Sequence, residues 1–458
     1  MKSIIIGGTP MVKISIIGAG SAMFSLSLIK DICLTPSLEG SVISFMDIDE
    51  QRLNSAYSLC ERYAKEANIH LILEKTTDRR ESLRGADFVM LAALIGGHQR
   101  LKDGWDIAQR HGYRFGGSLH VMHDEGFWIN FDQLQLMESV MQDILEICPN
   151  AWYMLVSNPV MAGVTYLQRK YPEAKLAGFC HGSNGVKAVA EVIGLDPEHI
   201  TYEIPGVNHF IWLTEFRYKG EDAFPILDRW IEEKSADYIE KCGTCDWLGP
   251  KAIDLYKKFG VFPIGDTGNP GGGAWPAWHH ADEETERFYK EDPQAWWRDL
   301  YFAGGAAGVE KIRRVSENTA EKVMDSFPPE HSTEPMIPFI EAIACDVPRV
   351  MILNILNDSN YVPGIPLDFQ VEIPCYVSGI GVQGIKTKGL PKPVIQYALR
   401  DRVAPVEMEL QAYGSGSYDD LVQLILMDPW TRSEQQARAL LDEILQMPSL
   451  VAMREHFK

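Results

Sequence analysis

The chain has 458 residues, of which 46% are hydrophobic and 23% charged, and its formal net charge is −20. This length favours two domains, and the composition is close to the average for globular proteins, which argues against disordered and fibrous classes. No block of Lys or Arg could follow a phosphate backbone and no apolar run has the length of a membrane span, so we expect neither a nucleic-acid partner nor a membrane partner.

The N-terminus lacks the basic region, apolar stretch and cleavage site of a secretory signal, which predicts a cytoplasmic protein. The orderly pattern begins at Met11, and a translation start there stays open. Eight scattered cysteines do not resemble a disulfide framework. Cys242 and Cys245 form a CxxC, but no second pair supplies the other ligands of a structural zinc site, so we interpret it as a loop.

From residue 11 to 200, apolar runs of strand length alternate with helical stretches such as 131–147. The predicted strands are 14–17, 42–46, 88–92, 152–156 and 175–179. Runs this apolar are typical of parallel strands buried on both faces and covered by helices. The pattern predicts an α/β fold whose first domain, 11–200, is a Rossmann-type parallel sheet with ligands at the carboxyl ends of its strands.

The first strand leads into a glycine turn and then an apolar helix, an arrangement that can hold a pyrophosphate at the helix N-terminus. Gly18 permits the turn, Gly20 lets the backbone approach the phosphates, and Ser21 offers a hydroxyl. The second strand ends in Asp47, which can bind both ribose hydroxyls and would repel the 2′-phosphate of NADP. The third glycine of the fingerprint is absent, and an ordinary turn is the alternative, but the order of elements favours an NAD site.

After residue 200 the alternation of strands and helices gives way to adjacent strand-like segments. We therefore predict a mixed α+β domain, 201–458, that binds substrate and metal and mediates oligomerisation. Its predicted strands are 201–204, 210–218, 350–356 and 369–377, with a Gly/Pro-rich stretch at 263–276. The apolar residues of the C-terminal helices indicate core or subunit interface. We expect a homo-oligomer.

Two separated residues predict a divalent metal site. Cys180 ends the fifth strand in the sequence GFCHG, and His209 lies in the strand-flanked turn PGVNHFIW. Together they can hold an ion and leave positions open for substrate oxygens. A buried cysteine beside an unrelated histidine is the alternative, since cysteine is among the most buried residue types.

The motifs GAGS, MDIDEQRL, LVSNPV, GFCHG, PGVNHFIW and PIGDT occur in this order from Met11 onward. In this the chain resembles glycoside hydrolase family 4, an NAD-dependent exception to two-carboxylate glycosidases. It is most similar to the branch with a Cys-His-Gly signature, which includes α-glucosidases and α-glucuronidases. The resemblance implies NAD and Mn²⁺ as cofactors, with Cys180 and His209 as metal ligands. It also implies oxidation at sugar C3, C2 deprotonation, elimination, water addition and re-reduction.

The resemblance further implies roles for residues of the site. Asp266, in PIGDT, matches the base that removes the C2 proton, and a loop aspartate that bonds to backbone amides is the alternative. His181 follows the metal cysteine and is the candidate acid, although it could instead support the metal site. Should Asp266 not act, Tyr256 is the nearest alternative in sequence.

Asn158, Asn208 and Arg114 are the predicted substrate-binding residues. Asn158 resembles a residue that hydrogen-bonds the sugar, with a turn beside Pro159 as the alternative. The segment 96–126 departs from the family's common pattern, so its candidates, Arg114 and the pair 123–124, are the least constrained. Arg114 could pair with a uronate carboxylate.

The sequence therefore predicts an NAD- and Mn²⁺-dependent glycosidase acting on a small α-glucoside or α-glucuronide. The alternative is an NAD-dependent dehydrogenase of a hydroxy acid or polyol, which would share the N-terminal fold and consume NAD stoichiometrically. A non-catalytic nucleotide sensor is a third alternative.

Overall fold

A 12-stranded sheet forms the centre of the computed structural model, which describes residues 5–6, 9–243, 246–269 and 275–458. Half of this sheet is parallel, in the order β5-β4-β3-β6-β7-β8. These strands are β3 (Lys13–Ile17), β4 (Val42–Met46), β5 (Ile72–Thr76), β6 (Phe88–Leu91), β7 (Trp152–Leu155) and β8 (Leu176–Gly178). Numbered along the chain, the order is 3-2-1-4-5-6, that of dinucleotide-binding domains. The predicted Rossmann-type sheet is confirmed.

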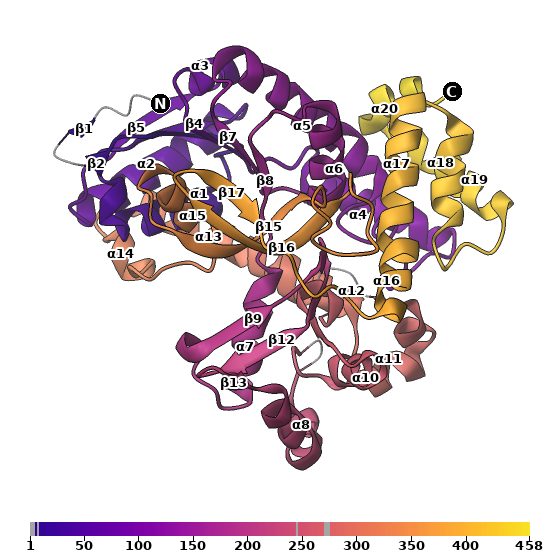
Figure 1. Cartoon of the computed structure of the whole chain (residues 1–458). Helices are drawn as coiled ribbons and strands as arrows, with labels where there is room; N and C mark the ends of the chain where they lie inside the picture. The colour runs from indigo at the N-terminus through magenta and orange to yellow at the C-terminus, as the bar shows by residue number, and fades with distance from the viewer. Residues whose placement is uncertain (1–4, 7–8, 244–245, 270–274) are drawn as a thin grey trace.

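Helices cover both faces of this parallel half (Figure 1). They are α1 (Ala22–Cys33), α2 (Glu50–Glu66), α3 (Arg79–Leu83), α5 (Phe127–Ile147) and α6 (Val160–Lys170). Two further helices pack elsewhere: α4 (Gly97–Arg110) shares a cluster with Leu421 and Leu441, and α7 (Gly185–Val192) one with Phe216 and Leu227. Because both faces are covered, strand residues such as Ile14, Ile16 and Phe88 are fully buried. This double coverage explains the unbroken apolar runs in the sequence.

Antiparallel strands from the C-terminal half extend the same sheet beyond β8, where Asn354 pairs with Gly178. They are β10 (Gly206–Val207), β11 (Phe210–Leu213), β14 (Phe262–Ile264), β15 (Arg349–Leu356), β16 (Gln370–Ser378) and β17 (Gly381–Gly384). The mixed character predicted after residue 200 is confirmed. The large sheet contains strands from both sides of the predicted domain boundary at residue 200, and that boundary stays a prediction.

The predicted strand 210–218 is two strands in different sheets. β12 (Glu215–Tyr218) leaves the large sheet and pairs with β9 (Ile200–Glu203) and β13 (Glu221–Asp222). Thr214, between β11 and β12, donates its backbone N–H to the Glu203 carbonyl and so starts the second pairing. The small sheet lies apart from the Rossmann region, at the bottom of Figure 1.

The C-terminal helices pack against the Rossmann region. They are α15 (Met336–Ala344), α16 (Lys392–Ala398), α17 (Ala404–Ser415), α18 (Tyr418–Leu426), α19 (Glu434–Leu445) and α20 (Val451–His456). Their buried apolar residues, Leu421 and Leu441 among them, share a cluster with Trp105 of α4 and Trp128 of α5. These apolar residues therefore form part of the core.

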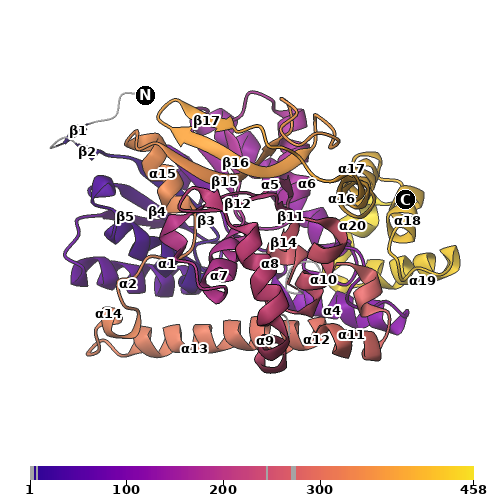
Figure 2. The ribbon, with the colours of Figure 1, turned by 60° about the horizontal axis from the view of Figure 1, so that its bottom comes forward.

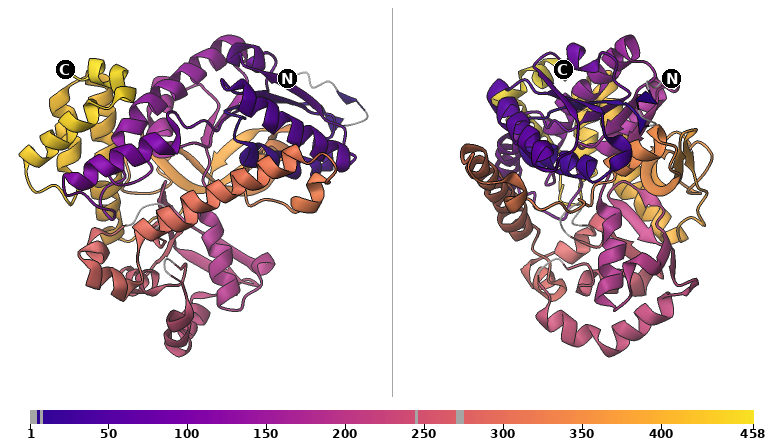
Figure 3. Two further views of the ribbon diagram at one scale, coloured as in Figure 1. Left: turned by 180° about the vertical axis from the view of Figure 1, so that it is seen from behind. Right: turned by 90° about the vertical axis from the view of Figure 1, so that its left-hand side faces the viewer.

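The middle of the C-terminal half is helical as well. Its helices are α8 (Phe224–Glu233), α9 (Ser235–Lys241), α10 (Pro250–Phe259), α11 (Glu283–Tyr289), α12 (Pro293–Ala295), α13 (Ala303–Glu317) and α14 (Val323–Ser326). A π-helical segment at 296–302 continues directly into α13. The two form a long rod across one face of the molecule, beside α1 and α2 (Figures 2 and 3).

No helix in the described part of the chain is long and apolar enough to cross a membrane. The cysteines within the described residues are free. Cys245 of the CxxC pair, and residues 270–274 of the Gly/Pro-rich stretch, lie outside the described residues. A short ladder, β1 (Ile5–Ile6) with β2 (Thr9–Pro10), precedes the fold.

Candidate active site

One edge of the sheet collects the polar residues that the sequence singles out. Asn158 follows β7 and Cys180 follows β8, both at the carboxyl ends of parallel strands. His209 lies in the turn between β10 and β11, and Asp266 lies in the turn η4 (Gly265–Thr267) directly after β14. Since β11 pairs with both β10 and β14, the antiparallel extension carries the last two to the same place.

The glycine turn after β3 packs closely on the segment that follows β6. Gly18 has φ +93°, and a Cβ there would lie 2.6 Å from the backbone nitrogen of Ala93. This is the point where the strand order reverses, and dinucleotides bind there in such sheets. Ser21 makes no capping hydrogen bond to any described residue at the start of α1. The first amides of a 12-residue helix are therefore open to an anion.

Asp47 is buried against the same turn. Its Oδ2 accepts a hydrogen bond from the Gly20 backbone N–H at 2.8 Å, and its Oδ1 accepts one from Asp49 N–H at 2.9 Å. A carboxylate has about four acceptor positions, so both oxygens retain capacity for ribose hydroxyls. The structure thus brings Gly18, Gly20, Ser21 and Asp47 together as the sequence predicts.

The Cys180 thiol lies beside the His209 ring and is half-buried. Burial and the nearby Glu372 carboxylate raise the pKa of Cys180 to about 11, although the contact with His209 opposes that shift. The thiol also accepts a hydrogen bond from the backbone N–H of Gly182 at 3.5 Å. A thiol in this state binds a metal ion only by losing its proton, so metal binding here releases a proton.

A tight hairpin holds His209 in an uncommon conformation. Val207 pairs with Phe210 around the turn, and His209 has φ +59°, a region that non-glycine residues enter at some cost and often at functional sites. Asn208 ties this turn to β16 through two hydrogen bonds. Its backbone N–H donates to Gln370 Oε1 at 3.1 Å, and its Nδ2 donates to Glu372 Oε2 at 3.0 Å.

Carboxylates surround the His209 ring. Nε2 lies 3.3 Å from Asp266 Oδ2, and Nδ1 lies 3.2 Å from Glu125 Oε1. Burial disfavours the imidazolium, but Asp266, Cys180 and Glu125 outweigh burial and raise the pKa of His209 well above its ordinary value. The ring is thus enclosed by groups that favour a cation.

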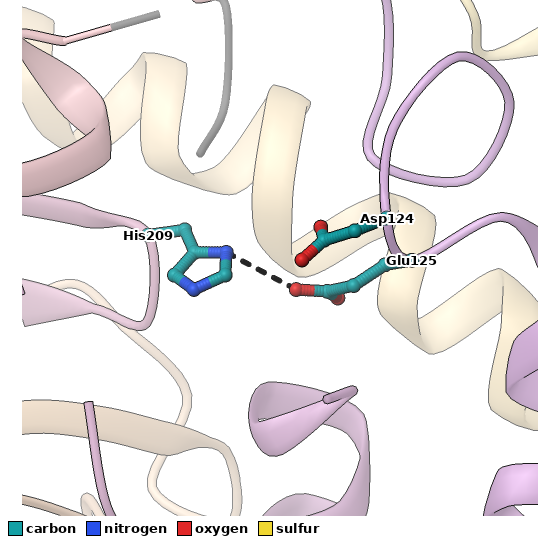
Figure 4. A group of neighbouring side chains, drawn as sticks. All are labelled: Asp124, Glu125 and His209. Atoms are coloured by element: carbon teal, nitrogen blue, oxygen red, sulfur yellow. Dashed lines mark ion pairs between the residues drawn. The ribbon is translucent and has the colours of Figure 1, made fainter. Parts of the chain in front are cut away.

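Asp124 and Glu125 lie just before Gly126, the N-cap of α5, and face His209 (Figure 4). Asp124 forms an ion pair with His123, and its Oδ2 accepts a hydrogen bond from Asn158 Nδ2 at 2.9 Å. Burial would raise the pKa of Asp124, but His123, with smaller contributions from His209 and Asn158, holds it at about 2. Asp124 therefore stays ionised, and Asn158 is oriented towards it.

The cluster has the donor types that a divalent transition metal requires. One ligand atom from each of Asp124, Glu125 and His209 lies within 4.8 Å of the others, and the Cys180 thiol adjoins the same ring. His209 Nδ1 and both Glu125 oxygens are buried without a hydrogen-bond partner among the described residues. Imidazole, thiolate and carboxylate together suit a first-row transition metal, so these residues fit the ion that the sequence predicts.

Three of the candidate residues are not brought to this cluster. Arg114 stacks over the Trp430 ring at 4.1 Å and donates to the Ala281 carbonyl. His181 is exposed at the start of the turn η2 (Gly182–Asn184). Tyr256 donates to Asp228 Oδ1 at 2.8 Å on α10, away from Asp266.

Sequence reasoning missed two buried groups of the site. Glu125 stands in the run His-Asp-Glu-Gly, where no periodicity marks a side chain as internal. Glu372 is a single acid inside the apolar strand β16, and that contrast is a usable signal. Burial raises the pKa of Glu372 to about 7, while Asn208 and His209 oppose the shift.

Comparison with known families gives two matches that together span most of the chain. The profile described as Family 4 glycosyl hydrolase matches residues 13–195. The profile described as Family 4 glycosyl hydrolase C-terminal domain matches residues 204–431.

Similar proteins and structures agree with these matches. An alpha-galactosidase of Bacillus subtilis is 24% identical over 432 residues, which cover 93% of this chain and 94% of the relative. An alpha-glucosidase of Erwinia rhapontici is 25% identical over 436 residues, covering 91% and 93%. The crystal structure of a 6-phospho-alpha-glucosidase from gut microorganisms, in complex with NAD and Mn²⁺, has a TM-score of 0.78 at 20% identity, covering 95% of this chain and 98% of that one.

Proposed function

The chain belongs to family 4 of the glycosyl hydrolases, and on that premise we propose that it hydrolyses small α-glycosides with NAD and Mn²⁺ as cofactors. The observation that carries the proposal is the meeting of Cys180, His209 and Asp266 at the same edge of the sheet as the glycine turn after β3. That juxtaposition couples a hydride acceptor, a metal site and a carboxylate base. The α-glucosidase and α-galactosidase relatives support an α-glycoside.

The chain's own groups divide the cofactor binding between two places. Gly18, Gly20 and Ser21 would receive the NAD pyrophosphate at the start of α1, with Asp47 on the ribose. Cys180 and His209 would hold the metal. When bound, NAD would take up and return the C3 hydride of the sugar, and the ion would polarise the C3 carbonyl.

Asp266 is the proposed base for the C2 proton. Its carboxylate is 23% exposed, so it combines access to a bound sugar with a position 3.3 Å from His209 Nε2. A carboxylate can remove a carbon proton only when an adjacent carbonyl acidifies it, which requires prior oxidation at C3. Tyr256 is a poor substitute, because its hydroxyl is already bonded to Asp228.

His181 is the proposed acid that protonates the leaving group. It follows Cys180 directly and its side chain is exposed, so it can meet a bound aglycone without rearrangement of the core. Glu334 lies close enough to interact with it electrostatically. An imidazolium is a common general acid in enzymes, which suits it to protonate a leaving oxygen.

The three predicted substrate-binding residues differ in their surroundings, and we propose different roles for them. Asn158 is half-buried beside Asp124, and we propose that it contacts the sugar. Asn208 is fully buried between Gln370 and Glu372, so we propose that it fixes the His209 turn instead. Arg114 points to Trp430 and would need to move to reach a uronate. The division into 11–200 and 201–458, homo-oligomerisation and a cytoplasmic location remain proposals.

An assay with a panel of aryl α-glycosides, neutral and uronic, tests the function. With Mn²⁺ and a small amount of NAD⁺, sugar release should exceed the NAD⁺ added many times, without net build-up of NADH. The panel also identifies the C6 group of the substrate. One NADH formed per product, with no aglycone released, would instead indicate the dehydrogenase.

A further inference from the structure

Glu125 is a fully buried carboxylate with an unmet hydrogen-bonding requirement. Its side chain is 0% exposed, and neither oxygen has a hydrogen-bond partner among the described residues. An unpartnered carboxylate this deep is costly, so such groups are normally paired or associated with a metal site. A neighbouring group is therefore expected to interact with the Glu125 carboxylate.

His209 is that neighbour. Its Nδ1, also buried and without a hydrogen-bond partner in the described structure, lies 3.2 Å from Glu125 Oε1. Figure 4 shows the carboxylate and the ring facing each other across this gap. The separation is that of a hydrogen bond, and a small rotation of either group would align it.

The other ring nitrogen faces a different set of groups. Nε2 lies 3.3 Å from Asp266 Oδ2. Asp266 follows Gly265, which packs on Gly182, and Gly182 donates to the Cys180 thiol. Asp266 and Cys180 therefore approach the ring from neighbouring turns, while Glu125 approaches Nδ1 from the start of α5.

Asp124 behaves differently although it is adjacent in sequence. It is ion-paired with His123 and accepts a hydrogen bond from Asn158. Its Oδ2 is thus hydrogen-bonded by Asn158, while its Oδ1 faces the His123 ring. Of the two carboxylates, Glu125 is the one that lies against a His209 ring nitrogen, at 3.2 Å from Nδ1.

We propose that Glu125 is a positioning residue for the metal ligand His209, an inference that rests on the proposed function. Glu125 accepts the Nδ1–H hydrogen bond. That bond fixes the tautomer whose Nε2 lone pair is free for the ion and fixes the ring orientation towards Cys180. Carboxylates in this position behind a metal-binding histidine typically strengthen metal affinity by about 10- to 100-fold.

Mn²⁺ binding to the full-length, chelator-treated protein tests this, with free Mn²⁺ measured by its EPR signal. Glu125→Ala should weaken binding roughly 10- to 100-fold. Glu125→Gln should weaken it less, because the amide oxygen can still accept the Nδ1 hydrogen. Glu221→Ala, which removes an exposed carboxylate on β13, is the control and should leave Mn²⁺ affinity unchanged. NAD binding, measured on the same samples, should be unchanged.

Co²⁺ substitution distinguishes a positioning residue from a direct ligand. At saturating Co²⁺, Glu125→Ala should show the same thiolate-to-cobalt absorption band from Cys180 as the unmodified protein. A changed cobalt spectrum at saturation, or unchanged Mn²⁺ affinity in both Glu125 variants, would overturn the inference. If the unmodified protein binds neither ion, the proposed function fails; if it binds and the Glu125 variants bind equally well, only this inference fails.

Discussion

Replacing Glu372 with glutamine should stabilise the metal-free protein at pH 8 and change it little at pH 4. Burial raises the pKa of Glu372 from the ordinary 4.5 to about 7. A tenfold change in a proton equilibrium corresponds to about 1.4 kcal/mol, so the ionised, buried carboxylate costs roughly 3 kcal/mol of stability. Glutamine is similar in shape and cannot ionise, so the variant avoids this cost.

The sign follows from proton binding. Between pH 4.5 and about 7 the folded state keeps a proton on Glu372 that the unfolded state has lost. The stability of the unmodified protein therefore falls as pH rises through this window, and the loss is complete above pH 7. The difference in the free energy of unfolding between Glu372→Gln and the unmodified protein should therefore grow over the same pH range.

Thermal unfolding in the presence of chelator measures this difference. The gap in Tm should be near zero at pH 4 and grow by a few degrees by pH 8, since 1 kcal/mol moves Tm by about 2 °C in large domains. Glu221→Gln, at an exposed position of β13, is the matched control and should run parallel to the unmodified protein. Parallel curves for Glu372→Gln would refute the assignment of a buried, proton-binding carboxyl beneath the site.

Three further predictions concern the site directly. Cys180→Ser or His209→Ala should lower activity at least about 100-fold, and chelation should do the same to the unmodified protein; full activity in chelator would contradict the metal role. Gly20→Ala places a Cβ 2.5 Å from Asp47 Oδ2, so NAD affinity measured by fluorescence titration should fall while Mn²⁺ binding persists; unchanged NAD affinity would remove the turn from the cofactor site. Asp266→Asn should reduce kcat about 100-fold or more with NAD and Mn²⁺ still bound, and normal turnover would exclude Asp266 as the base.

Most of the Rossmann sheet could be predicted because its strands are buried on both faces and so appear as apolar runs. The strand β5, Ile72–Thr76, escaped prediction because it is the edge strand of the sheet and its side chains are mostly exposed. The division between β11 and β12 could not be seen either, since 210–218 is one continuous β-like stretch and only long-range pairing separates it. Such pairing leaves no local pattern in the sequence.

The site was predictable where a residue type is rare and its place in the fold is fixed. Cys180 is predicted at the end of a strand and His209 in a turn between strands. The structure brings the two residues together. Glu125 and Arg114 come from an irregular segment, where periodicity gives no direction for a side chain. The sequence therefore named Arg114, which stacks on Trp430, and passed over Glu125, which faces His209.

The position of solvent deuterium in the product tests the proposed chemistry most directly. If Asp266 removes the C2 proton from a C3-oxidised sugar, hydrolysis in D₂O should give sugar carrying deuterium at C2, detected by NMR or mass spectrometry. Asp266→Asn should lose exchange and turnover together. Active enzyme that releases sugar without deuterium at C2 would contradict the account and favour direct displacement at C1.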